Sequence, residues 1–77
     1  MRVQVRTYSG YKADERPTEF VLNGRHFRVV RICDRWLGPD ASYFKVRADD
    51  ENYYIFEYRT ATDEWSLTSF RSHLHES

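Results

Sequence analysis

The sequence predicts an all-β domain: a small curled antiparallel meander or partly open barrel, SH3-like or OB-like, of five to six strands. Short apolar–polar alternations run through the chain, and Gly, Pro and Asn divide them into blocks of strand length. A chain of 77 residues is too short for two large stacked sheets, and curling is the simplest way for one sheet to protect its edges. We therefore expect one domain over residues 1–77, with residues 71–77 as a polar tail.

The first half of the chain predicts three strands. Residues 1–6 alternate apolar and polar, residues 9–17 read as a polar loop, and residues 18–22 form a second strand. Asn23-Gly24 is typical of a type I′ hairpin turn, in which both central residues take positive φ. The returning strand covers residues 25–37.

This long strand contains a change of parity. Its apolar residues stand at odd positions up to Val29 and at even positions from Val30 through Ile32 to Trp36. A shift of one residue within a strand is typical of a β-bulge, which we expect near residues 29–30. Such a bulge would bend the strand, so that it serves two parts of a curled sheet.

The second half predicts three more strands. Residues 42–48 and 53–59 flank an acidic hairpin loop, and a last strand runs from Trp65 to about Phe70. The residues expected to face the core are Phe44, Val46, Ala48, Tyr54, Phe56 and Tyr58. The spacing of Leu67, Phe70 and Leu74 also allows a short C-terminal helical turn.

Composition excludes several classes of protein. A single Cys excludes a disulfide framework and a Cys-rich zinc site, and no apolar run is long enough for a membrane span. Twelve basic and twelve acidic side chains cancel, which argues against a protein that coats DNA indiscriminately. The charge is uneven, however: net +4 over residues 24–47 and −5 over residues 48–77. Either the two regions pair across strands, or the surface is dipolar with a basic face for an acidic partner.

No combination of residues points to catalysis. Cys33 and His26 are seven positions apart, which is about 23 Å along an extended strand, so they cannot form a nucleophile–base pair. His73 and His75 have no third ligand nearby in sequence, and residues 49–51 lack the alternating spacing of a calcium loop. We expect no enzymatic activity, no metal site and no cofactor.

Aromatic and cationic side chains alternate on one predicted sheet face. The candidate binding residues are Arg28, Arg31, Tyr43, Lys45, Arg47, Tyr53 and Arg59. Rings that stack on bases beside cations that contact phosphates are the ingredients of single-strand binding. Tyr and Arg are also frequent anchors of protein interfaces, and cross-strand aromatic pairs can serve stability alone.

The string Asp34–Asp40, with the sequence DRWLGPD, is the most distinctive in the chain. Trp36 precedes its tight turn, and we expect this side chain to be largely buried, as Trp usually is. Its indole N–H needs an acceptor, and Asp34 lies two positions earlier on the same face. Asp34 would either accept that hydrogen bond or pair with an arginine.

Several strings resemble a family of small bacterial cytoplasmic proteins of unknown function; these are residues 8–17, 34–40, 43–50 and 54–55. A weaker resemblance links residues 43–65 to the C-terminal tail of Y-family polymerase-like proteins of the bacterial mutasome. That tail has an aromatic-rich strand, an acidic turn, a second aromatic strand and a Trp. The second resemblance implies a β module in DNA-damage tolerance. The first implies no known activity, and the polymerase catalytic carboxylates have no counterpart in this chain.

The leading hypothesis is a non-enzymatic binding module of the bacterial cytoplasm. Its expected partner is a protein or a single-stranded nucleic acid, with no membrane and no small-molecule cofactor. One alternative is a small enzyme or enzyme subunit that uses a metal and the turn carboxylates of Asp40 and residues 49–51. Another is a homo-oligomeric structural protein in which a second copy completes the thin core.

Overall fold

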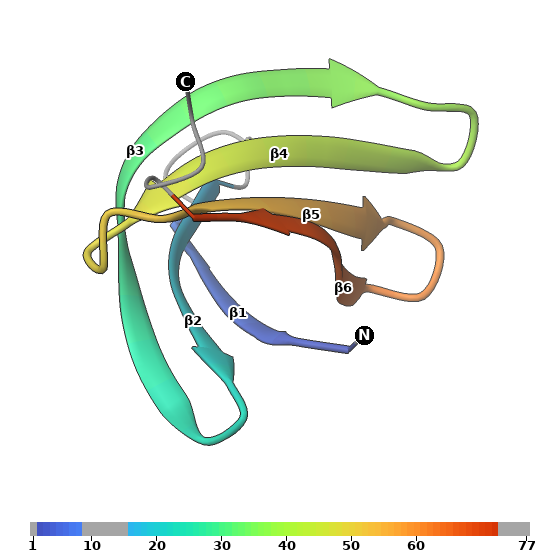
Figure 1. Ribbon diagram of the computed structural model, residues 1–77. Coiled ribbons are helices and arrows are strands. Elements are labelled where there is room, and N and C mark those ends of the chain that lie inside the picture. Colours follow the sequence, from blue (N-terminus) through green and yellow to red (C-terminus); the bar gives the residue numbers. More distant parts are fainter. Residues whose placement is uncertain (1, 9–15, 73–77) are drawn as a thin grey trace.

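The chain forms one curled antiparallel sheet of six strands, in a computed structural model that describes residues 2–8 and 16–72 (Figure 1). The strands lie in the sheet in the order in which they occur in the sequence, as a meander. They are β1 (Gln4–Tyr8), β2 (Arg16–Leu22), β3 (Arg25–Leu37), β4 (Ala41–Ala48), β5 (Tyr53–Arg59) and β6 (Glu64–Arg71). The prediction of an all-β curled meander is confirmed.

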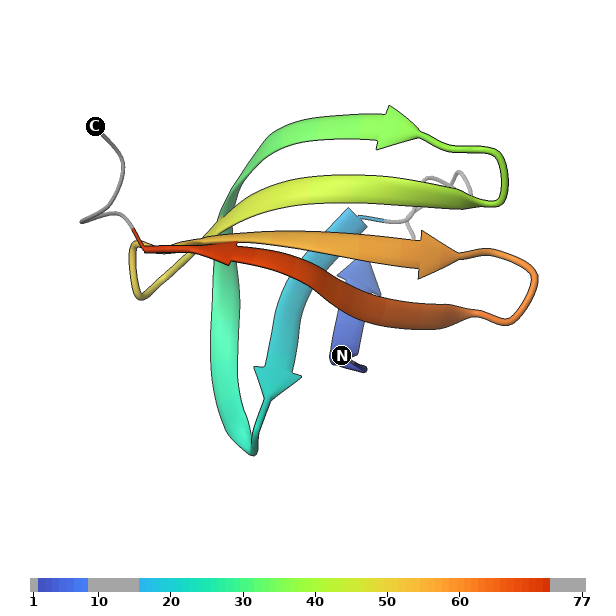
Figure 2. The ribbon, with the colours of Figure 1, turned by 45° about the vertical axis from the view of Figure 1, so that its right-hand side comes forward.

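Strand β3 bends and belongs to two parts of the sheet, as Figure 2 shows. Its first residues pair with β2, and its remaining residues pair with β4. The ladder to β4 shifts register between Val29 and Arg31 and again between Ile32 and Asp34. The bulge predicted near residues 29–30 is therefore confirmed, and a second, unpredicted bulge follows at Cys33.

The second bulge reverses the parity of β3 again. The parity of the sequence groups Val30, Ile32 and Trp36 on one face, and this grouping is wrong for Val30 and for Trp36. Val30 is the extra residue of the first bulge and is 62% exposed. Trp36 lies opposite Tyr43 and is 40% exposed, so the expectation of a buried Trp36 is also wrong. Ile32 packs against the core as expected.

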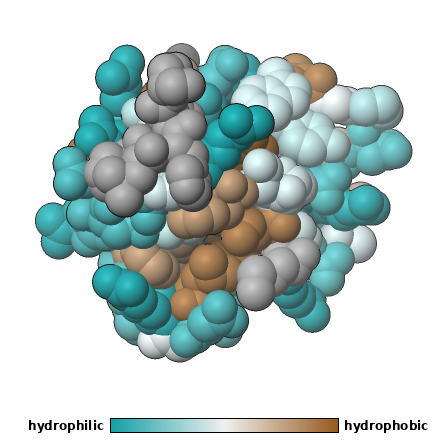
Figure 3. Space-filling model, in the orientation of Figure 1, coloured by the Kyte–Doolittle hydropathy of each residue, from teal (hydrophilic) through white to brown (hydrophobic). Residues whose placement is uncertain are grey.

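Aromatic rings fill the inside of the curl. The Phe20 ring lies at their centre, with its centroid 4.9 Å from those of Phe27, Tyr54 and Phe56. The buried cluster consists of Val3, Phe20, Phe27, Phe44, Val46, Ala48, Tyr54, Phe56 and Trp65. Tyr58 packs against it, so the predicted inward-facing set of β4 and β5 is confirmed. Figure 3 shows apolar surface gathered where the strands curl around this core, with hydrophilic residues around it.

Among the described residues, the segment before β1 meets strand β6 at one end. Arg2 forms an isolated bridge with Ser66, and the Val3 N–H donates to the Trp65 carbonyl at 3.2 Å. The Arg2 guanidinium lies 2.7 Å from the Glu64 carboxylate. A groove of about 680 Å³ opens between the edges of β1 and β6. The sheet is thus a half-barrel, closed at one corner.

Turn chemistry fixes the hairpins. Asn23 and Gly24 have φ values of 52° and 78°, as the predicted type I′ turn requires. Glu51, in the β4–β5 turn, has a φ of 70°, which is uncommon for a residue with a side chain.

The predicted C-terminal helical turn lies only partly within the described residues. Leu67 and Phe70 lie in β6, so the helical turn is wrong for these two residues. Leu74, the tail beyond residue 72 and most of the predicted 9–17 loop lie outside the described residues, and Arg16 and Pro17 already belong to β2. The described part of the chain contains no helix with the length and apolar character that crossing a membrane requires.

Asp50 holds the β4–β5 turn in place. Its Oδ2 accepts hydrogen bonds from the Tyr54 hydroxyl at 2.6 Å and the Asn52 amide at 3.0 Å. Its Oδ1 accepts from the Asn52 backbone N–H at 3.0 Å. Partial burial by itself raises the pKa of Asp50, but the hydrogen bonds from Tyr54 and Asn52 outweigh it and lower that pKa below its ordinary value.

We expect Asp50→Ala to destabilise the fold by about 1 kcal/mol at neutral pH, since the carboxylate is partly solvated. Because the pKa of Asp50 is lower in the folded chain, its contribution is complete above the unfolded-state pKa of about 4. It is lost as the pH falls through the folded-state pKa. Urea denaturation at neutral pH and at successively lower pH values should therefore show the two proteins converging in acid. A difference independent of pH would contradict this role.

Candidate functional site

The outer face of strands β3 to β6, turned away from the core, carries rows of functional side chains. The register sets Arg31 opposite Arg47, Arg47 opposite Tyr53, and Tyr53 opposite Arg71. We call these four residues the arginine row. It crosses four neighbouring strands, with one aromatic ring among three guanidinium groups.

Among the described residues, the charges of the arginine row are only partly balanced. The Arg47 guanidinium carbon lies 5.9 Å from the Tyr53 ring centroid, and Lys45 Nζ lies 5.3 Å from the same centroid. Arg47 Nη2 also lies 3.4 Å from Glu51 Oε1 in an exposed pair. Like charges directly opposite each other destabilise a sheet, so the facing Arg31 and Arg47 favour a bound anion over a purely structural role.

An aromatic pair lies on the same face, farther along the strands. The rings of Trp36 and Tyr43 stack with centroids 5.6 Å apart and an interplanar angle of 7°. The Tyr43 hydroxyl donates to Glu57 Oε2 at 3.1 Å, and this hydrogen bond, with some desolvation, raises the pKa of Tyr43. A Cβ on Gly38 would lie 2.9 Å from Tyr43 Cε2, so the Tyr43 ring packs directly against the turn.

A middle row separates the arginine row from the aromatic pair. Lys45 has Asp34 opposite it on β3 and Ile55 opposite it on β5. Asp34 Oδ1 accepts a hydrogen bond from the Arg35 backbone N–H at 2.8 Å. The sequence predicts two alternative partners for Asp34, the Trp36 indole N–H and an arginine side chain. The observed donor is instead a backbone N–H.

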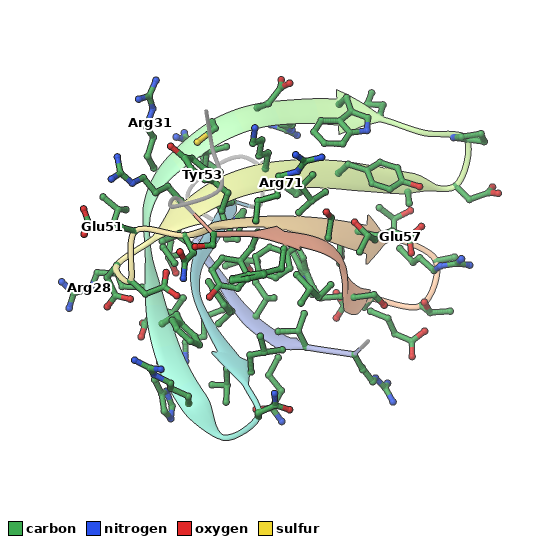
Figure 4. All side chains as sticks on the ribbon, viewed as in Figure 1. Arg28, Arg31, Glu51, Tyr53, Glu57 and Arg71 are labelled. Atoms are coloured by element: carbon green, nitrogen blue, oxygen red, sulfur yellow. The ribbon has the colours of Figure 1, made fainter. Side chains whose placement is uncertain are left out.

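The structure brings together six of the seven sequence-predicted site residues on one face: Arg31, Tyr43, Lys45, Arg47, Tyr53 and Arg59. Arg28 lies on the other side of the first bulge, opposite Glu19, and its carbonyl accepts from the Asp49 N–H at 2.9 Å. Arg59 lies opposite Ala41, with its Nε 3.5 Å from Glu57 Oε1. Figure 4 shows Arg28 and Glu51 toward one end of the sheet and Glu57 toward the other.

Two residues of this face are missing from the sequence prediction. Arg71 extends β6 by one residue beyond the predicted end and completes the arginine row. A signal for it exists, because Ser69 and Arg71 continue the polar alternation of the strand. Trp36 is missed because its outward orientation depends on the second bulge, for which the sequence gives no clear signal.

The carboxylates of the enzyme alternative do not form one site. Asp40 lies in the β3–β4 turn, whereas residues 49–51 lie in the β4–β5 turn, at the opposite end of β4. Asp50 is engaged in its own turn. Among residues 2–8 and 16–72, no group of three or more His, Cys, Asp or Glu side chains is placed to hold a metal ion. His73 and His75 lie outside the described residues.

No family model, curated protein or solved structure matches this chain.

Proposed function

We propose that the protein is a non-enzymatic module that binds single-stranded nucleic acid on the outer face of β3 to β6. The observation that carries the proposal is the arginine row, in which Arg31, Arg47 and Arg71 flank the Tyr53 ring. Guanidinium groups form charge-assisted hydrogen bonds with phosphate, and aromatic rings stack on bases of any sequence. A phosphate between Arg31 and Arg47 would also relieve the repulsion between these facing cations.

The shape of the face favours a single strand over a duplex. The described residues contain no helix that could enter a major groove, and the site is a sheet surface rather than a projecting element. Small curled sheets of OB type bind single strands across such a face. We propose, from the resemblance to mutasome proteins, a cytoplasmic role in bacterial DNA metabolism.

Fluorescence anisotropy tests the proposal with labelled 12-nucleotide oligo-dT, oligo-rU and a duplex of equal length. We expect a Kd of about 1–100 μM for the single strands at low salt, and weaker binding to the duplex. Contacts to about four phosphates predict a slope of about −3 for log K against log salt concentration. Absence of single-strand binding at low salt, or tighter binding to the duplex, would refute the proposal and leave a protein partner as the remaining use of this face.

Glu51 competes with a ligand for Arg47. Its carboxylate lies 3.4 Å from the Arg47 guanidinium, and its φ of 70° is unfavourable for a residue with a side chain. We expect Glu51→Gly to stabilise the fold by about 0.5 kcal/mol and to tighten oligonucleotide binding about two- to fivefold. Glu51→Asn also tolerates positive φ and should reproduce the gain in binding. Weaker binding by both variants would contradict this competition.

A further inference from the structure

We propose, on the basis of the proposed function, that the single strand crosses the sheet diagonally, from Arg71 past Lys45 to Trp36. One base stacks on Tyr53 and a second on Trp36, and the backbone between them passes Lys45. The ligand is thereby defined as a run of about four to six nucleotides with two separate stacking positions.

The register defines the diagonal. Tyr53 lies on β5 opposite Arg47, and Trp36 lies on β3 opposite Tyr43. Because both partners belong to β4, that strand gives the offset between the two residues along the sheet. These two levels are four positions apart on β4, or about 13 Å along the strand, and two interstrand spacings add about 10 Å across the sheet. The backbone positions that carry the two rings are then about 16 Å apart. A strand with a rise of about 3.4 Å per nucleotide covers this distance in about five steps, and a more extended strand in fewer.

Lys45 lies on this diagonal, one level from each ring. Its ammonium group is already 5.3 Å from the Tyr53 ring centroid, and it is the only cation in the middle row of the outer face, beside Asp34 and Ile55. A backbone phosphate between the two stacked bases would meet this ammonium group. Arg47 and Arg71 lie on either side of Tyr53 and are positioned for the phosphates that flank the first base.

Trp36 offers a ring face on the open side of the sheet. Tyr43 covers one face of the indole, whereas residues 29–37 of β3 pair with β4 alone among the described residues. The second face therefore points toward an edge that no described strand covers. The hydrogen bond from Tyr43 to Glu57 and the contact with Gly38 hold the supporting ring in place. A ring ordered in advance loses little entropy when a base stacks on it.

A length series tests this path by anisotropy, with oligo-dT of two to twelve nucleotides. We expect affinity to rise steeply up to about six nucleotides and then only slightly. In a six-nucleotide ligand, removal of single bases should weaken binding at two separated positions, each about five- to fiftyfold. In the Trp36→Ala protein, removal of the base at one of these positions should no longer weaken binding. In the Tyr53→Ala protein, the same should hold for the other position. A plateau at two nucleotides, or loss at one position only, would overturn the diagonal path.

Tryptophan fluorescence gives an independent measurement with a matched control. The chain has two tryptophans, and Trp65 is only 7% exposed, so stacking on Trp36 should account for quenching by saturating oligo-dT. Trp36→Phe should remove the quenching and retain most of the affinity. Leu37→Ala changes an apolar neighbour that is 77% exposed and should leave affinity and quenching unchanged. Quenching that persists in Trp36→Phe, in a protein that still binds, would refute the inference and spare the proposed function, whereas absence of binding by the native protein would refute both.

Discussion

Phe20→Ala is expected to destabilise the protein by about 3–5 kcal/mol, a large fraction of its total stability. Phe20 is 1% exposed, and three aromatic rings surround it at centroid distances of 4.9 Å. A domain of this length is stable by only about 4–12 kcal/mol, and a curled single sheet has little other core to close the cavity. Urea denaturation followed by circular dichroism measures the loss.

Phe70→Ala is the matched control for this substitution. The Phe70 ring also packs against Tyr54, with ring centroids 5.1 Å apart, but Phe70 is 51% exposed. Its truncation should cost less than about 1 kcal/mol, because much of the ring is already in water. Equal losses for the two variants would contradict the assignment of Phe20 as the centre of the core.

The triple variant Arg31→Gln, Arg47→Gln and Arg71→Gln is expected to bind single-stranded oligonucleotides at least 100-fold more weakly at low salt. The expectation follows from the loss of three charge-assisted phosphate contacts on one row. For single strands, the loss of three phosphate contacts should also make the slope of log K against log salt concentration less negative by about 2. Anisotropy titrations at several salt concentrations measure both effects.

A second triple variant controls for net charge. Arg6→Gln, Arg16→Gln and Arg25→Gln remove the same charge from exposed positions on β1, β2 and the first part of β3. This protein should keep most of the affinity and most of the salt slope. Loss of the Arg31–Arg47 repulsion should leave the arginine-row variant folded and at least as stable as the native protein. Equal weakening by the two triple variants would indicate diffuse charge attraction and no defined site.

Local signals explain why so much of the fold could be predicted. Alternation with a period of two marks strands wherever one face is buried, and β3 and β5 end where the sequence indicates. Asn23-Gly24 specifies its turn through positive φ, and a change of parity reveals the bulge at Val30.

The remaining features depend on pairing between distant segments. The bulge at Cys33 arises from the fit of β3 to β4, and it alone turns Trp36 outward beside Tyr43. The alternation along a strand shows which face of the sheet a residue lies on, but it does not show which residues of the neighbouring strands lie beside it. For this reason, the sequence does not show that Arg28 lies beyond the first bulge or that Arg59 lies at the end of the face remote from the arginine row, and Arg71 is missing from the predicted set. The bridge from Arg2 to Ser66 joins opposite ends of the chain and has no local signal.

The most direct test of the nucleic-acid interface is an NMR titration of the ¹⁵N-labelled protein with a six-nucleotide single strand. The largest shifts are expected at the backbone amides of Arg31, Lys45, Tyr53 and Arg71 and at the Trp36 indole, with β1 and β2 almost unaffected. Shifts concentrated on β1 and β2, or in the groove between β1 and β6, would contradict the assignment of this face as the binding surface.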